Sequence, residues 1–130
     1  MSDFSRPALI ISDAALPSDE WLFPEPLVAP PGRIIRPLYG VPETAKFFFG
    51  RGSSWLRVNE RKAMLDGKPL EEVIGPRDAN QRREYTLYDI ERMAHAFAES
   101  QIITGERLRL ALRLLQLQAH VWRYLTEGTI

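Results

Sequence analysis

The chain of 130 residues contains no cysteine, so disulfide bonds, thiolate zinc sites and cysteine nucleophiles are excluded. It has no apolar run near the ~18 residues needed to span a bilayer, and no membrane partner is expected. Its first residues lack the basic, apolar and small-residue order of a signal peptide. We therefore expect one soluble, intracellular domain, since a compact domain takes roughly 100–200 residues.

Net charge is absent as well, because 17 basic residues balance 17 acidic ones. The balance is local rather than uniform. Residues 1–50 carry a net charge of −2, residues 51–62 of +3 and residues 77–83 of +2. Electrostatic effects are screened within about 8 Å at physiological salt, so a local basic surface can bind nucleic acid on a neutral chain. The alternative is an ordinary solvated surface of mixed charge.

Prolines are concentrated at the start of the chain, with seven of the ten in residues 1–37. Each proline fixes φ and removes a backbone donor, so this stretch cannot hold a long helix or a central strand. We predict an extended, proline-rich N-terminal arm over residues 1–38, with apolar anchors at Trp21, Leu22 and Phe23. Such an arm either packs across its own domain or docks on a partner.

The pattern becomes helical over residues 39–100, which we predict to form one domain. A short helix starts near Val41 and is broken at residues 50–52, which read Gly-Arg-Gly. Ser53 is predicted to cap a second helix over residues 54–64. Two short helices joined by a tight glycine-containing turn form a helix-turn-helix.

A small β-hairpin is predicted to follow the second helix. Asp66-Gly67 and Gly75-Pro76 are turn signals, which leave residues 70–74 and 82–86 as the two strands of a projecting wing. Thr86 and Asp89 then fit a capping box that opens a third helix, running to about Glu99. The predicted inner face of that helix comprises Leu87, Ile90, Met93, Ala94 and Phe97.

The last predicted element is a long helix within residues 101–130, capped by Thr104 and ending near Gly128. It carries two apolar stripes, more than one face of a small domain needs to bury. We therefore expect a homo-oligomer, most simply a dimer, through the stripe formed by Leu108, Leu112, Leu115, Ala119 and Trp122. The alternative is that the proline-rich arm covers the second stripe, which comprises Leu110, Leu114, Leu117, Val121 and Leu125.

Residues 50–61, which read Gly-Arg-Gly-Ser-Ser-Trp-Leu-Arg-Val-Asn-Glu-Arg, resemble the recognition-helix segment of MerR-type winged helices. Leu56, Arg57 and Glu60 match in place, whereas Trp55 replaces the usual threonine and Val58-Asn59 replaces two aromatic residues. Shorter matches to the family's first helix and to its wing-to-helix stretch are Glu43, Ala45, Lys46, Arg83, Tyr85, Asp89 and Ile90.

The resemblance covers residues 39–125 and is closest to MerR-like proteins of actinobacterial phages. These share segments like Ala-Lys-Phe-Phe-Phe and Tyr-Thr-Leu-x-Asp-Ile-x-x-Met-Ala-His-Ala. It implies a mainly α fold, a MerR-like winged helix-turn-helix with a small β-hairpin wing, a long C-terminal helix and the extended arm. The lack of cysteine and of a following effector domain does not support metal or redox sensing.

The same resemblance implies double-stranded DNA as partner, with the second helix in the major groove. Ser53, Ser54 and Arg61 are the candidates for groove contacts. Arg57 resembles the family arginine that contacts phosphate and fixes register. The other predicted DNA contacts are Arg51, Lys62, Arg77, Arg82 and Arg83.

Other notable side chains have plainer interpretations. Trp55 is predicted to belong to the core, and residues 47–49 to packing. His95, with Tyr88 and Glu91, is predicted to lie on an outer, solvated face of the third helix. His120 is placed on a polar strip of the fourth. No zinc-protease sequence, phosphate loop or nucleophile elbow is present, so we expect no enzyme activity, no metal and no cofactor.

Two classes of function stay open. The first is a phage DNA-binding protein in the host cytoplasm, a transcriptional or architectural regulator. The second is a virion structural protein of the head or head-tail connector, in which the winged helix binds protein and the arm laces neighbouring virion proteins together. A small terminase subunit is a further version, although the chain leaves little room for the assembly region that such subunits carry.

Overall fold

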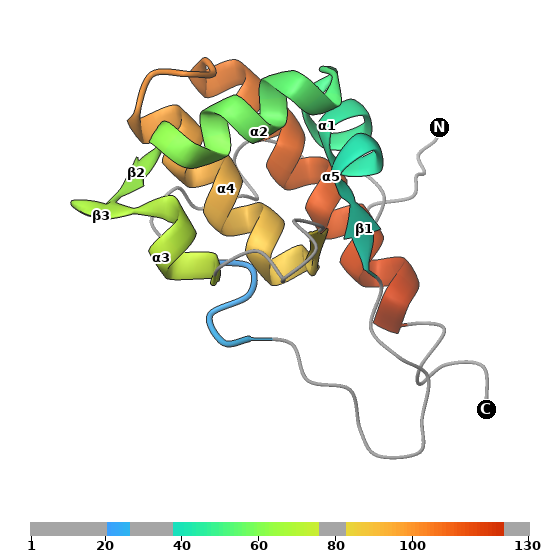
Figure 1. The fold of residues 1–130 in the computed structure, drawn as a ribbon. Helices are drawn as coiled ribbons and strands as arrows, with labels where there is room; N and C mark the ends of the chain where they lie inside the picture. Colours follow the sequence, from blue (N-terminus) through green and yellow to red (C-terminus); the bar gives the residue numbers. More distant parts are fainter. Residues whose placement is uncertain (1–20, 27–37, 76–82, 124–130) are drawn as a thin grey trace.

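The computed structural model describes residues 21–26, 38–75 and 83–123 of the chain (Figure 1). Within these ranges the protein is mainly helical, with two small antiparallel sheets. The elements are β1 (Tyr39–Gly40), α1 (Val41–Phe49), α2 (Ser53–Lys62), β2 (Met64–Leu65), β3 (Lys68–Pro69), α3 (Leu70–Ile74), β4 (Glu84–Tyr85), α4 (Leu87–Glu99) and α5 (Gly105–Arg123).

The turn between α1 and α2 lies where the sequence predicts it. Gly50 ends α1 in the left-handed conformation, with φ 65°, and its N–H donates to the Lys46 carbonyl. Glycine adopts this conformation without the steric cost that a Cβ brings. The next helix begins one residue earlier than predicted, because Gly52 occupies the N-cap position and Ser53 is the first helical residue. The prediction of Ser53 as the cap is therefore wrong.

The predicted wing strand at residues 70–74 is also wrong, because these residues form α3. Glu71 and Glu72 have low strand propensity, and acids in the first turn of a helix interact favourably with its dipole. The second predicted strand is partly present as β4, which pairs with β1 and places Tyr85 opposite Tyr39. The predicted wing tip at residues 76–82 lies outside the described residues.

A tight hairpin forms nearer to α2 than the sequence predicts. β2 and β3 pair with Met64 opposite Pro69, around a turn in which Asp66 and Gly67 have φ values of 53° and 79°. Two successive positive φ angles are typical of the turns that join two-residue hairpins, and Asp and Gly tolerate them. The Asp66-Gly67 turn signal is therefore confirmed, with different strands on either side of it.

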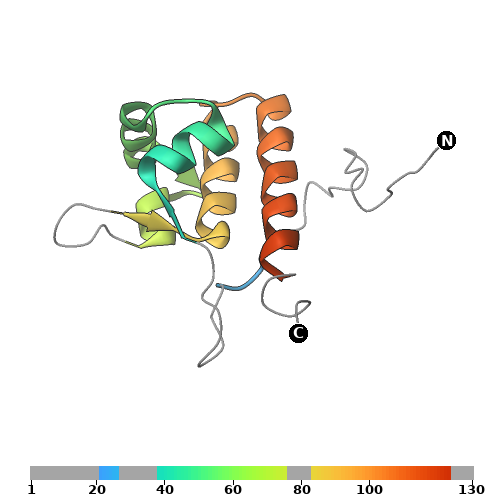
Figure 2. The ribbon, with the colours of Figure 1, turned by 90° about the vertical axis from the view of Figure 1, so that its right-hand side faces the viewer.

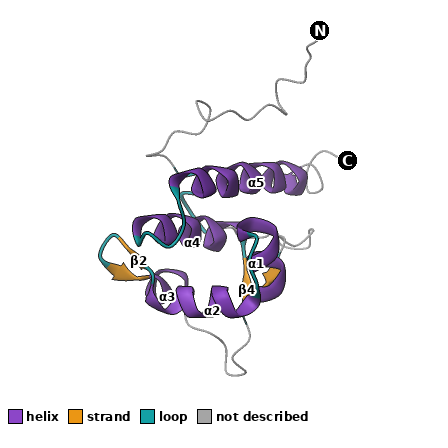
Figure 3. Cartoon of the chain, turned by 90° about the horizontal axis from the view of Figure 1, so that it is seen from above, coloured by secondary structure: helices purple, strands orange, loops and turns teal. Residues whose placement is uncertain are grey.

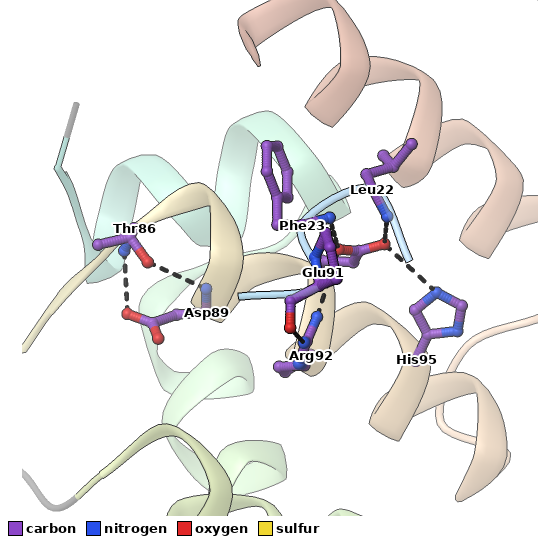
Figure 4. Close-up of polar contacts among 8 residues, drawn as sticks. Leu22, Phe23, Thr86, Asp89, Glu91, Arg92 and His95 are labelled. Carbon is purple, nitrogen blue, oxygen red and sulfur yellow. Dashed lines mark hydrogen bonds and ion pairs between the residues drawn. The ribbon is translucent and has the colours of Figure 1, made fainter. Parts of the chain in front are cut away.

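Helix α4 starts at the predicted capping box. The Asp89 N–H donates to the Thr86 hydroxyl at 3.1 Å, and the Thr86 N–H donates to the Asp89 carboxylate at 3.0 Å (Figure 4). These two bonds satisfy donors that the first turn of a helix leaves without partners. The predicted inner face of α4 is confirmed, since all five of its residues are fully buried: Leu87, Ile90, Met93, Ala94 and Phe97.

Helix α4 is the centre of the fold. It lies between α5 on one side and α2 and α3 on the other (Figure 3). Helices α4 and α5 run side by side and make the most extensive contact between any two elements (Figure 2). The start of α5 is as predicted, because the Thr104 hydroxyl accepts a bond from the Arg107 N–H at 3.1 Å. The predicted end near Gly128 lies outside the described residues.

The stripe of α5 predicted to form a dimer is instead buried within the chain. Ala111, Leu112, Leu115 and Ala119 belong to the hydrophobic core, and Leu108 packs against it. Trp122 is half-buried on the same side of the helix. Leu112, Leu115 and Ala119 stabilise the monomer and are not available to a second copy, so the prediction of these three as oligomerisation residues is wrong. Leu108 and Trp122 are half-buried, and for them it stays a prediction. Periodicity reveals two apolar stripes but not which of them faces α4.

Across the described ranges, no helix combines the length and the apolar character that crossing a membrane requires.

Candidate nucleic-acid interface

Helix α2 turns one face inward and another outward. Leu56 and Glu60 are fully buried, whereas Arg57, Val58 and Arg61 are exposed, with Val58 retaining 55% of its accessible surface. Ser54 is exposed on the same face. Side chains at these spacings follow one side of a helix, so they form one continuous outward surface.

The turn before α2 adds a further cation to this surface. Arg51 is exposed, and its guanidinium carbon lies 5.4 Å from the centre of the Trp55 ring. Trp55 in turn packs against Phe49 and Phe97, with ring centres 5.8 and 5.4 Å away. The prediction that Trp55 belongs to the core is confirmed in part, since the side chain is half-buried and packs against the core. A cation held over an indole ring is positioned by it, so Arg51 stays near the start of α2.

Exposed charge over residues 51–62 is of one sign. Glu60 is the only acidic residue in this range, and it is fully buried. The surface formed by Arg51, Arg57, Arg61 and Lys62, called the α2 basic face below, is therefore not neutralised from within its own helix. Ser53 is half-buried at the start of the helix, beside exposed Ser54. Arg77 and Arg82 lie outside the described residues.

Arg83 does not join the α2 basic face. Its Nε lies 2.7 Å from a Glu60 carboxylate oxygen, and the two side chains are 6% and 0% exposed. Arg83 also donates to the Gly75 carbonyl at 2.7 Å, and the Tyr85 hydroxyl donates to the other Glu60 oxygen. Arg83 therefore compensates the buried Glu60 charge, and its prediction as a phosphate contact is wrong. Helical spacing from Leu56 places the aliphatic stem of Glu60 on the inward face, but it does not reveal that Arg83 pairs with its carboxylate.

The outer face of α4, predicted to be solvated, is covered by residues 21–26, called the clip below. The Leu22 and Phe23 N–H groups donate to the two Glu91 oxygens at 2.7 and 2.9 Å (Figure 4). Glu91 is fully buried, and the His95 side chain is only 17% exposed. The prediction of a surface position for His95 and its neighbours is therefore wrong, since the anchors noted in the arm do not reveal which helix they cover.

Burial beneath the clip changes the acid–base properties of α4. Desolvation raises the pKa of Glu91, and the bonds from Leu22 and Phe23 with the charge of Arg92 partly oppose this. Burial, with a smaller effect of the Arg92 charge, lowers the pKa of His95. His95 is therefore neutral at pH 7, and its approach to Glu91, 4.0 Å between Nε2 and Oε2, is not an ion pair under those conditions.

A second uncovered surface lies on α5. Leu110, Leu117 and Val121 retain 38%, 37% and 49% of their accessible surface. They belong to the second apolar stripe noted in the sequence, and His120 beside them is exposed as predicted. A groove of about 450 Å³ lies next to this stripe, lined by Tyr39, Glu43, Lys46, Phe47 and Gln118.

Among the described residues, no three His, Asp or Glu side chains gather as a metal site requires. Comparison of the chain with protein-family models, with curated proteins and with solved structures found no match in any of the three.

Proposed function

We propose that this chain is a DNA-binding protein of the MerR-like winged-helix type, a phage regulator of transcription or DNA architecture acting in the host cytoplasm. The observation that carries the proposal is the α2 basic face. Four cations are exposed over twelve residues, while the one acid among them is buried. A polyanion is the partner that such a local surface attracts.

The proposed docking places α2 in the major groove. This groove is wide enough to admit a helix, and its base edges carry a distinguishable pattern of donors and acceptors. Ser54 and Arg61 would face base edges, with Ser53 at the start of the helix, and Arg57 would contact phosphate. Arg51 and Lys62, at the two ends of the α2 basic face, would contact flanking phosphates and fix the register without reading sequence. The role is binding, with no catalytic step and no cofactor.

We further propose that two copies associate through the exposed stripe of α5. Leu110, Leu114, Leu117 and Val121 are separated by four, three and four residues, the spacing of a helix–helix seam. Of these, Leu114 is half-buried and the other three are exposed. A two-fold dimer would present two α2 helices to a roughly palindromic DNA site.

The test is binding of the full chain to random duplex DNA at low salt. We expect Arg57→Ala with Arg61→Ala to weaken binding strongly, since each removes a charge from the α2 basic face. Lys46→Ala is the matched control, because Lys46 is an exposed cation on the side of α1 that faces α5. Equal binding by both variants would refute the proposed interface.

Three observations favour the alternative of a virion structural protein. The clip and the exposed α5 stripe both offer protein–protein contacts, and the total charge is zero. A head or connector component would assemble into a ring rather than a dimer. Sedimentation of the full chain separates the two, because the regulator is expected as a dimer and the ring as a much larger species.

A further inference from the structure

The clip is held on α4 by a site that recognises main chain as well as side chains. Glu91 accepts the N–H groups of two consecutive residues, Leu22 and Phe23, through its two oxygens. Arg92 donates to the Pro24 carbonyl at 3.5 Å, so three consecutive residues of the clip are held through their main chain. Contacts of this kind fix an extended peptide in one direction and register.

Two aromatic side chains of the clip supply the specificity. The Arg92 guanidinium carbon lies 4.1 Å from the Trp21 ring centre and 4.0 Å from that of Tyr88, so it is stacked between the two rings. His95 packs edge-on against Trp21, with ring centres 4.4 Å apart. Phe23, which is 7% exposed, enters the hydrophobic core. Anchors of this size dominate the affinity of most peptide sites.

The seat beneath the clip is not closed around Trp21. A cavity of about 380 Å³ remains there, lined by Trp21, Leu65, Asp66, His95, Ala98, Glu99 and Leu108. A continuous core packs to nearly the density of an organic crystal and leaves few such spaces. The clip therefore borders an open recess at Trp21, whereas its release also withdraws Phe23 from the hydrophobic core.

The covalent link between the clip and the rest of the fold is long. Residues 27–37 separate the clip from Leu38, and a stretch of this length spans at most about 40 Å. A link of this length gives the clip an effective concentration in the millimolar range at its own seat. A neighbouring copy reaches the same seat when it is held close by, or when the resident clip is removed.

We propose that the outer face of α4 is a receptor for a Trp-Leu-Phe-Pro segment, and that its second occupant is the clip of another copy of this chain. Exchange of clips would join copies side by side without further contacts. The proposal is independent of DNA binding, since it uses α4 and the clip and no residue of the α2 basic face.

The test uses two full-length variants, each unable to seat its own clip. Trp21→Ala with Phe23→Ala removes the anchors, and Glu91→Ala with Arg92→Ala removes the groups that hold them. Because the chain has no cysteine, Glu25→Cys in the second variant gives one attachment point for a spin label on the exposed part of the clip. Far-ultraviolet circular dichroism checks that both variants keep their helices.

Adding the first variant to the labelled second one brings together one intact clip and one intact seat. The proposal predicts a saturable loss of label mobility, and none when the added chain carries all four substitutions. A label that stays mobile with either addition overturns exchange and leaves the clip as an internal clamp. The readout is unaffected by pairing through α5, because both additions keep that stripe.

A second measurement uses a chain that keeps its own clip and seat, so it remains valid if the substitutions of the first test unfold the protein. Isotopically heavy protein that carries a photoreactive group at residue 25 is mixed with unlabelled protein. The concentration is ~1 mM, near the effective concentration of a tethered segment. Exchange predicts cross-links from heavy clips to light α4 segments. Cross-links confined to heavy chains would overturn it.

Discussion

At the scale of single residues, burial decides the role of each charged side chain. Arg83 and Arg57 are both cations next to a predicted DNA-binding surface, and the sequence treats them alike. Only Arg83 has a buried carboxylate within reach, at 2.7 Å, and its side chain is almost fully covered. Replacing either arginine is therefore expected to have a different effect on stability and on DNA binding.

Replacing Arg83 should lower stability. In Arg83→Ala the Glu60 charge stays buried without its cation, which typically costs about 3–5 kcal/mol. Arg57→Ala removes an exposed charge and should change the free energy of unfolding by no more than about 0.5 kcal/mol. Urea unfolding of the two variants measures the difference. An Arg83→Ala protein that is as stable as the parent but binds DNA more weakly would show that Arg83 contacts DNA.

The lowered pKa of His95 predicts how the stability of the fold depends on pH. Its folded pKa lies below the ordinary value of 6.5, so the unfolded chain binds a proton more readily than the folded one. The contribution of His95 is fully present above pH 6.5 and is lost as the pH falls through the folded pKa. The charged groups near it are Arg92 and Glu91, with Asp66 and Glu99 at the same cavity.

The measurement is the free energy of unfolding between pH 7.5 and pH 5.5. We expect it to fall more steeply in the parent chain than in His95→Gln, which has no proton to gain at this position. His120→Gln is the control, because His120 is exposed and should leave the slope as it is. Identical slopes in the parent and His95→Gln would show that His95 is not the group responsible.

At the scale of elements, local rules are enough where short-range interactions dominate. The capping box at Thr86, the glycine break after α1 and the inward face of α4 depend on neighbours within one or two turns. The interpretation of residues 70–74 fails because it assumes pairing with the nearby residues 82–86, whereas β4 pairs with the distant β1 and residues 70–74 form α3. Pairing over long sequence separations is not encoded in local propensity.

Two leucines of α5 allow the effect of core burial to be measured separately from the effect of self-association. Leu115 is fully buried against the core, and Leu117 is 37% exposed. Leu115→Ala should lower the free energy of unfolding by about 2–5 kcal/mol, the cost of a core cavity. Leu117→Ala should leave that quantity nearly unchanged at low protein concentration but weaken self-association measured by sedimentation. The reverse pattern would contradict the placement of the two stripes.

At the scale of the whole molecule, the zero net charge is the sum of charges that differ in position and in depth. The cations of residues 51–62 are exposed, while Glu60 and Glu91 are buried, beneath Arg83 and the clip respectively. The candidate DNA contacts Ser54, Arg57 and Arg61, named from the sequence, do lie on the exposed face of α2. The sequence did not predict the covered face of α4, because that requires knowing where a segment 68 residues away comes to rest.

The most direct test of the central claim is the salt dependence of DNA binding by the full chain. Four exposed cations on the α2 basic face predict a slope of log K against log salt of about −3 to −4 for each bound copy. Arg57→Ala with Arg61→Ala should reduce that slope by about two units for each copy. No binding at about 50 mM salt, or a slope that the two substitutions leave unchanged, would contradict the proposal that α2 binds DNA.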